Sequence, residues 1–230
     1  MIVNEFVQTA FQQNTRIVSC ENTGEAICID PGEESPEVLR HLNENGLSLT
    51  AICLTHGHLD HIGGTAYLHE HFPDTEIVAH RDEAELYYSL PQQPLMMGVE
   101  PHQLKAMGMD YSDPPQITRY VADNEILEVG DMRFKIRHCP GHTPGHIVLI
   151  EEDEKTVFTG DCLFSDTIGR TDLPGGDYDQ LIRSIEDNIL TLPDDFTICC
   201  GHGPNSTVGR ERTGNPFLNG AYDLTRSGRV

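Results

Sequence analysis

The chain has 230 residues, of which 37% are hydrophobic and 23% are charged, and its formal net charge at pH 7 is -22. This length is ample for a hydrophobic core, whereas the excess of acidic side chains argues against a protein that binds the phosphate backbone of nucleic acids. No apolar run reaches the ~18 residues of a membrane-spanning helix, and the first residues lack the basic and apolar regions of a secretory signal.

Strands and helices alternate along the first third of the chain. Short runs with β-branched residues predict strands over 3–7, 15–20 and 26–30, and compact apolar runs predict strands over 49–54 and 77–79. Ser35 as N-cap and Pro36 at the first helical position predict a helix over 35–43, and residues 65–71 are predicted to form another. This alternation predicts an α/β fold.

The region 81–120 begins with a predicted acidic helix over 81–88 and then becomes rich in proline and methionine. Its apolar side chains are expected to pack in the core, and lining of a substrate cleft is the alternative. Strands are predicted over 125–129, 132–138, 146–150, 156–159 and 196–199, with a helix over 178–190. Too few residues follow the last strand to form a second domain, so we expect a single domain over 1–230.

The seven cysteines are scattered and form no CxxC pair. This pattern indicates neither a disulfide framework nor a thiolate zinc site. We expect reduced, buried cysteines in a cytoplasmic protein, and a secreted enzyme whose signal has been removed is the alternative.

Metal-binding side chains are concentrated directly after the predicted strand over 49–54. His56, His58, Asp60 and His61 lie within six positions, and imidazole and carboxylate groups are the ligands that Zn²⁺ takes in open, catalytic sites. In an extended turn, His56 and His58 point one way while Asp60 and His61 can face a neighbouring position. The spacing therefore predicts two adjacent metal sites.

Three later segments repeat the pattern of a polar residue beside glycine at the end of a predicted strand. These residues are His142, Asp161 and His202. Glycine allows the backbone to approach an ion closely, and functional groups often gather at the carboxyl ends of strands. We expect the four segments to converge on one place.

The segment His56-Gly57-His58-Leu59-Asp60-His61 resembles the HxHxDH motif of the metallo-β-lactamase superfamily, and His142, Asp161 and His202 follow in the order and spacing of that family. The resemblance implies an αββα sandwich of two mixed β-sheets flanked by helices, with two divalent metal ions at one edge. The implied ligands are His56, His58 and His142 for the first ion and Asp60, His61 and His202 for the second, with Asp161 bridging both.

Zinc is the expected metal, although the same donors accept iron and manganese. A hydroxide between the two ions would be the nucleophile, and Asp60 is expected to orient it. His146 is expected to form a hydrogen bond behind the ligands rather than to bind an ion. Asp30 has two open interpretations, as a residue that orients a ligand or as a turn cap.

Within the superfamily, residues 141–146, 160–164 and 201–204 resemble the glyoxalase II-like group, which hydrolyses hydroxyacylglutathione thioesters. This resemblance implies a thioester hydrolase acting on S-lactoylglutathione or a similar hydroxyacyl-thiol, with Arg170 binding a carboxylate of the substrate. A solvated or salt-bridged Arg170 is the open alternative. The chain departs from the pattern of that group in two respects. Asp172 stands where the group often has an aromatic residue, and the chain is expected to lack the group's C-terminal helical domain. Residues 206–217 resemble the short, single-domain subgroup.

Two alternatives stay open. Residues 169–172 also resemble persulfide dioxygenases, in which a single iron would use His56, His142 and Asp161 and the substrate would be glutathione persulfide. Those enzymes often have cysteine at the position of His146, which favours hydrolysis here. The second alternative is a metal-stabilised scaffold protein without catalytic activity.

Overall fold

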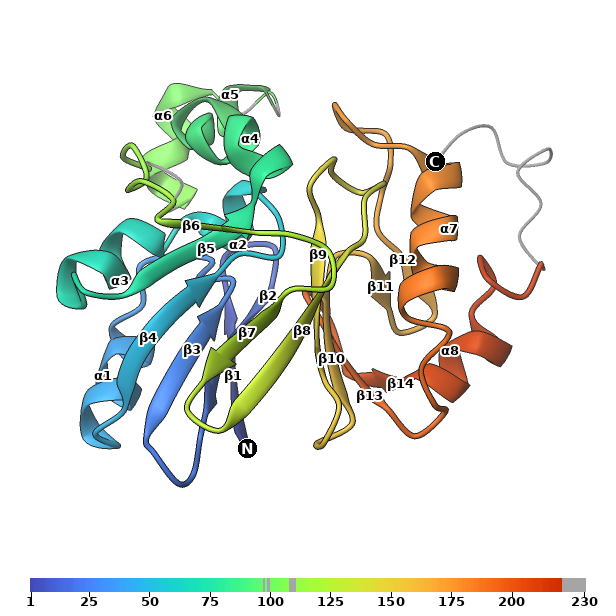
Figure 1. Ribbon diagram of the computed structural model, residues 1–230. Helices are drawn as coiled ribbons and strands as arrows, with labels where there is room; N and C mark the ends of the chain where they lie inside the picture. Colours follow the sequence, from blue (N-terminus) through green and yellow to red (C-terminus); the bar gives the residue numbers. More distant parts are fainter. Residues whose placement is uncertain (97, 99, 108–110, 221–230) are drawn as a thin grey trace.

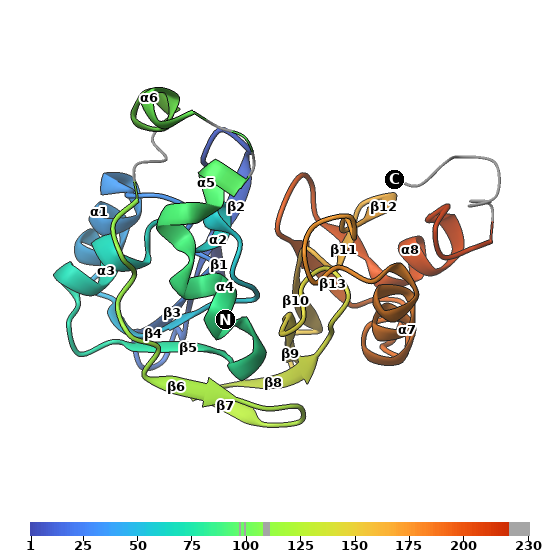
Figure 2. The same ribbon diagram turned by 90° about the horizontal axis from the view of Figure 1, so that it is seen from above.

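The computed structural model describes residues 1–96, 98, 100–107 and 111–220. Two six-stranded mixed β-sheets pack face to face, and helices cover the outer face of each sheet (Figures 1 and 2). This four-layer αββα arrangement confirms the fold class predicted from the sequence. Residues 221–230, which the predicted single domain included, lie outside the described residues.

The first sheet follows the chain order from β1 to β6. Its first three strands are antiparallel, and the last four run parallel to one another. Parallel neighbours need crossover connections, and the first two of these contain the helices α1 (Pro36–Glu44) and α3 (Thr65–His71). The strands are β1 (Ile2–Gln8), β2 (Gln13–Ser19), β3 (Glu25–Ile29), β4 (Ser48–Cys53), β5 (Glu76–His80) and β6 (Arg119–Val121).

Helix α1 illustrates how local sequence determines an element. Ser35 Oγ accepts a hydrogen bond from the backbone N–H of Val38, and Pro36 occupies the first turn, where its missing N–H costs nothing. Val38 and Leu42 are buried in the core between the helices and the first sheet. The helix predicted over 35–43 is thereby confirmed to within one residue.

The second sheet has the order β14-β13-β10-β9-β8-β7. Only β10 and β13 are parallel, and the chain between them contains the small hairpin of β11 (Leu163–Phe164) and β12 (Thr167–Ile168) and the helix α7 (Tyr178–Asn188). The helix α8 (Val208–Gly214) follows the last strand. The strands are β7 (Ile126–Val129), β8 (Met132–His138), β9 (Ile147–Glu151), β10 (Thr156–Gly160), β13 (Thr197–Cys200) and β14 (Ser206–Thr207).

The apolar core between the sheets draws on both of them. Ile27 and Val78 from the first sheet pack in one buried cluster with Phe134 and Phe158 from the second, whose rings are 6.1 Å apart in an edge-on arrangement. A further apolar core lies between each sheet and its helices. Burial of both faces explains why β2 and β10 are buried along their whole length.

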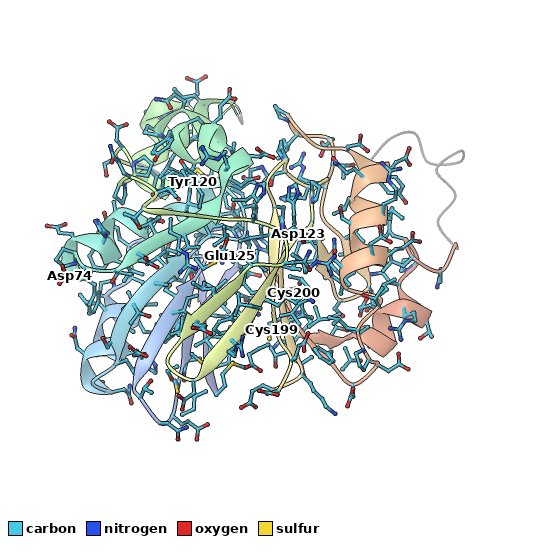
Figure 3. The ribbon with its side chains drawn as sticks, in the orientation of Figure 1. Asp74, Tyr120, Asp123, Glu125, Cys199 and Cys200 are labelled. Atoms are coloured by element: carbon cyan, nitrogen blue, oxygen red, sulfur yellow. The ribbon has the colours of Figure 1, made fainter. Side chains whose placement is uncertain are left out.

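The chain passes from the first sheet to the second between β6 and β7, in the stretch that contains Asp123 and Glu125 (Figure 3). Asp123 Oδ1 accepts hydrogen bonds from Arg137 Nε at 2.9 Å and from the backbone of His138 at 3.0 Å. Glu125 accepts a bond from Arg119 at 2.9 Å. These bonds fix the connection to strands of both sheets.

All seven cysteines are buried, free thiols, as the sequence predicts; Cys199 and Cys200 lie on β13 (Figure 3). No helix in the described part of the chain is long and apolar enough to cross a membrane.

Between β5 and β6 the chain forms a group of short helices beside the first sheet (Figure 1). The acidic helix predicted over 81–88 is divided there, because a 3-10 turn, η1 (Arg81–Glu83), precedes α4 (Ala84–Tyr88). The other short helices are α2 (Leu59–Ile62), which follows β4, and η2 (Leu90–Gln92), α5 (Gln93–Met96), α6 (Pro101–Leu104) and η3 (Lys105–Met107).

Candidate metal centre

The structure brings all seven predicted ligands together at one edge of the sandwich. They come from segments that follow β4, β8, β10 and β13, so both sheets contribute. His56, His61, His142 and Asp161 are buried, while His58, Asp60 and His202 are partly exposed. The convergence of four separate segments agrees with the expectation from their positions at strand ends.

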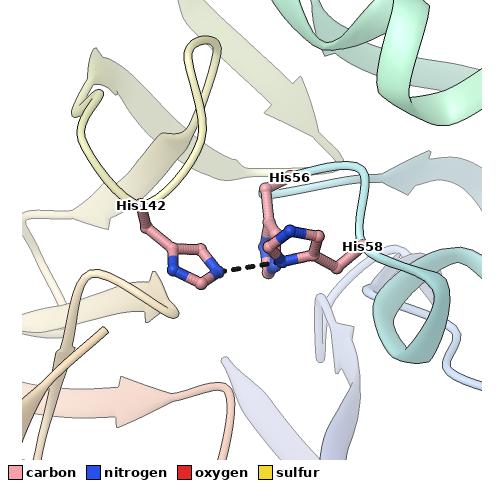
Figure 4. A group of neighbouring side chains, drawn as sticks. All are labelled: His56, His58 and His142. Carbon is pink, nitrogen blue, oxygen red and sulfur yellow. Dashed lines mark hydrogen bonds between the residues drawn. The ribbon is translucent and has the colours of Figure 1, made fainter. Parts of the chain in front are cut away.

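The first cluster consists of His56, His58 and His142 (Figure 4). His142 Nε2 lies 2.9 Å from His58 Nδ1, although the two residues are 84 positions apart. One ring nitrogen from each residue lies within 4.8 Å of the others. Three nitrogen atoms at such separations could bind one metal ion.

The second cluster consists of Asp60, His61 and His202. His202 Nε2 lies 3.2 Å from Asp60 Oδ2 and 3.2 Å from His61 Nε2. The first turn of α2 places Asp60 and His61 beside each other, whereas His202 arrives from the end of β13.

Asp161 lies between the two clusters. Its Oδ1 is 3.3 Å from His61 Nε2, and its Oδ2 is 3.7 Å from His142 Nε2 and 3.5 Å from His202 Nε2. One carboxylate therefore approaches a histidine of the first cluster and two residues of the second.

The outer nitrogens of four histidines identify where their protons lie. Each Nδ1 faces an oxygen that accepts its proton, which leaves the Nε2 lone pair free. Thr55 Oγ1 is one of these accepting oxygens, because the Thr55 hydroxyl donates its own proton to Asp30 at 2.6 Å. The four pairs are His56 with Thr55 Oγ1 at 3.1 Å, His61 with Asp30 Oδ2 at 2.9 Å, His142 with Arg170 O at 2.7 Å and His202 with Phe11 O at 3.0 Å.

The inward-facing atoms fit a cation better than they fit one another. His61 Nε2 and His202 Nε2 both present lone pairs across 3.2 Å, and lone pairs that face each other repel unless a proton or a metal ion lies between them. In addition, His56 Nε2 and Asp161 Oδ1 are buried without a hydrogen-bond partner among the described residues. Buried polar atoms are rarely left without a partner, so this donor set is suited to divalent metal ions.

The protonation states of the two clusters differ. Burial lowers the pKa of His58 to about 3 and lowers the pKa of His56 and His142. Burial by itself also lowers the pKa of His202, but its hydrogen bonds with Asp161 and Asp60 outweigh this effect and raise that pKa to about 9. The first cluster thus holds neutral imidazoles, and a metal ion at the second would replace a proton.

Comparison with known proteins identifies the family of this chain. A family model that describes the Metallo-beta-lactamase superfamily matches residues 9–202. The chain belongs to the metallo-β-lactamase superfamily. It is 41% identical over 217 residues to a protein of Haemophilus influenzae called hydroxyacylglutathione hydrolase GloC, with 92% of this chain and 95% of that protein covered.

Solved structures of the superfamily are similar along almost the whole chain. The crystal structure of BLEG-1 B3 metallo-β-lactamase has a TM-score of 0.82 at 30% identity and covers 95% of this chain and 100% of that one. TTHA1623 in a di-iron-bound form has a TM-score of 0.78 at 33% identity and covers 94% and 100%. ETHE1 from Myxococcus xanthus has a TM-score of 0.78 at 26% identity and covers 96% and 85%.

Asp30 and His146 contact two of the predicted ligands from behind. Asp30 is buried, and besides its bond to His61 it accepts the backbone N–H of Thr55 at 2.7 Å. Both of its oxygens are therefore in use, which favours the interpretation that Asp30 orients a ligand. His146 Nε2 accepts the backbone N–H of Asp161 at 3.1 Å, in agreement with the expected hydrogen bond.

Several polar residues that hold the loops of the centre carry no recognisable signal in the sequence. Gln93, from the region rich in proline and methionine, donates to the carbonyl of Gly57 at 2.8 Å and accepts the N–H of Leu59 at 2.8 Å. On the other side, the buried Arg16 donates to the carbonyl of Cys200 at 2.7 Å, two residues before His202.

A cavity of about 560 Å³ opens over the metal centre. Phe11, Phe164 and Leu173 form part of its apolar wall, and Asp60 and Asp161 lie among its lining residues. Arg170 also lines the cavity, where its guanidinium group makes two hydrogen bonds of 2.7 Å to Asp172. A substrate carboxylate at Arg170 would have to compete with Asp172.

Proposed function

We propose that the protein is a metal-dependent thioester hydrolase, and that its substrate is S-lactoylglutathione or a similar hydroxyacyl-thiol. The observation that carries this proposal is the convergence of seven metal-binding side chains beneath a cavity that also contains a cation, Arg170. The similarity to hydroxyacylglutathione hydrolase GloC supports the same substrate class.

The proposed ligands are His56, His58 and His142 for one ion and Asp60, His61 and His202 for the other, with Asp161 shared between them. We propose zinc as the resident metal, and iron and manganese also suit these donors. Two bound cations would polarise the thioester carbonyl and lower the pKa of a water molecule to roughly 7.

The residues of the chain would orient the reactants. Asp60 lines the cavity and is proposed to orient the attacking water through its carboxylate. The thiol leaving group has a pKa near ~8.5, so its departure requires no protein acid. The apolar wall that includes Phe11 and Phe164 would exclude bulk water from the acyl group. We further propose that the protein acts in the cytoplasm, because free buried thiols suit a reducing compartment.

The presence of a complete second cluster argues for hydrolysis over the dioxygenase alternative. A single iron on His56, His142 and Asp161 would leave Asp60, His61 and His202 without a role. One ligand atom from each of these three residues nevertheless lies within 4.8 Å of the others. The di-iron form of TTHA1623 shows that a related fold binds two metal ions.

Elemental analysis combined with a thioester assay tests the proposed function. Protein loaded with zinc, iron or manganese should hold two ions per chain and hydrolyse S-lactoylglutathione. One iron per chain with oxygen uptake on glutathione persulfide would establish the dioxygenase instead. Hydrolysis of a β-lactam but not of the thioester would indicate a β-lactamase, and bound metal without turnover on any of these substrates would indicate a scaffold protein.

Arg170 is predicted to anchor the substrate without taking part in bond cleavage. In R170A the KM for S-lactoylglutathione should rise about tenfold, equivalent to ~1.4 kcal/mol, while kcat changes less than threefold or so. The KM for a thioester of an uncharged thiol should not change, because that substrate offers no carboxylate. R133A removes an exposed arginine from β8 and serves as the control; an unchanged KM in R170A would exclude the contact.

A further inference from the structure

A buried carboxylate joins the two loops that carry the first metal cluster. Glu83, at the end of η1, is 1% exposed. Its Oε2 accepts the backbone N–H of Gly57 at 2.8 Å, and its Oε1 accepts the N–H of Gly145 at 2.6 Å. Gly57 lies between His56 and His58 in the loop that follows β4 of the first sheet. Gly145 lies three residues after His142 in the loop that joins β8 and β9 of the second sheet.

Glycine is required at position 145 for this close approach, and position 57 leaves little room for a side chain. A Cβ atom at Gly145 would lie 2.6 Å from the backbone nitrogen of Glu83, and a Cβ at Gly57 would lie 3.0 Å from its Oε2. The first distance is shorter than real Cβ atoms show, so any side chain at Gly145 would force the loop away from η1. Both loops are therefore built to reach the same carboxylate.

We propose that Glu83 is a positioning residue that sets the separation of His58 and His142 and thereby determines how tightly the first cluster binds its metal ion. Each loop carries part of the cluster, and the bonds from Gly57 and Gly145 hold the loops against each other. A carboxylate suits this role because both of its oxygens accept hydrogen bonds, whereas a glutamine would turn its amide donors toward one of the two N–H groups.

The effect should be confined to the first cluster, because other contacts hold the second. Asp30 orients His61 at 2.9 Å, and Arg16 and Asn14 both donate to the carbonyl of Cys200 beside the His202 loop. None of these three residues contacts Glu83 through a described hydrogen bond. The inference rests on the proposed metal ligands and is independent of the proposed substrate.

The test measures zinc affinity by competition with a chelator for E83Q in three backgrounds. In H202A, which leaves only the first cluster complete, E83Q should raise the zinc Kd about 10- to 100-fold, as losses behind metal ligands do. In H58A, which leaves only the second cluster complete, the Kd should change less than about twofold. In the otherwise unaltered protein, one of two binding steps should weaken.

Equal zinc affinities with and without E83Q in the H202A and unaltered backgrounds would overturn the proposal. An equal loss of zinc affinity at both clusters would also overturn it, because that result would indicate a general defect of folding. Thermal unfolding of the metal-free proteins separates stability from affinity. The matched control is E211Q, which alters another fully buried carboxylate that accepts a backbone bond, from Asp166 at 2.9 Å, and should leave both affinities unchanged.

G145A offers a second route to the same result if E83Q does not fold. It leaves the carboxylate in place but pushes the second loop away from it, so the first cluster alone should again lose affinity. Unchanged zinc affinity in a folded G145A protein would contradict the proposed positioning role of Glu83. Because affinity is measured without substrate, failure of the thioester assay would not affect this conclusion.

Discussion

Replacement of Asp161 by alanine is expected to abolish turnover and to release both metal ions. Its carboxylate oxygens lie 3.3 Å from His61 Nε2 and 3.7 Å from His142 Nε2, so the substitution removes a charge that both clusters share. Asp60 would then be the one carboxylate left among the seven candidate ligands, so both clusters would attract cations less strongly. We expect metal affinity to fall more than ~100-fold and kcat/KM to fall by ~10³ or more, about 4 kcal/mol of transition-state stabilisation.

The measurement is the metal content of D161A after dialysis against a weak chelator, together with kcat/KM for S-lactoylglutathione. D153A is the matched control, because Asp153 is an exposed aspartate in the turn between β9 and β10. Two retained ions with turnover within tenfold of the unaltered protein would show that Asp161 is not a shared ligand.

Replacement of His58 by alanine is expected to remove one ion and to leave the other. His58 belongs to the first cluster, where its Nδ1 lies 2.9 Å from His142 Nε2 (Figure 4). The contacts of the second cluster, including the bond between His61 and Asp30, do not involve it. Because the proposed reaction uses both ions, turnover should fall by ~10³ while the chain still binds one equivalent of zinc.

Stepwise zinc titration, followed by the thioester assay on the fully loaded protein, checks this result. H71A is the control, since His71 is an exposed histidine on α3 whose ring contacts Tyr67. If H58A lost both ions, the two clusters would bind cooperatively as one unit. If it kept both, the assignment of His58 would be wrong.

Much of the candidate centre could be predicted from the sequence because its proposed ligands are clustered and chemically distinctive. Four of the seven lie within six positions, and the other three are each preceded by glycine at a strand end. The N-cap at Ser35 and the proline at position 36 likewise determine α1 by local contacts alone. Such features depend on neighbours in the chain, so they can be recognised without the fold.

The pairing of residues across the two sheets was decided by the tertiary structure. The contact of His58 with His142 spans 84 positions, and it exists because β4 and β8 end at the same edge of the sandwich. The two interpretations of Asp30 were separated only when the fold brought it to His61, 31 positions away.

Glu83 shows most clearly what sequence alone could not provide. It is one of 37 acidic residues, and its distinguishing property is that two backbone N–H groups from different sheets lie within reach of its oxygens. Any carboxylate could accept those bonds if it were placed there. The family and the candidate ligands could thus be recognised from side-chain chemistry at fixed spacing. The residues that hold these side chains in position were decided by packing, because a hydrogen bond to a backbone amide requires proximity and leaves no pattern in the chain.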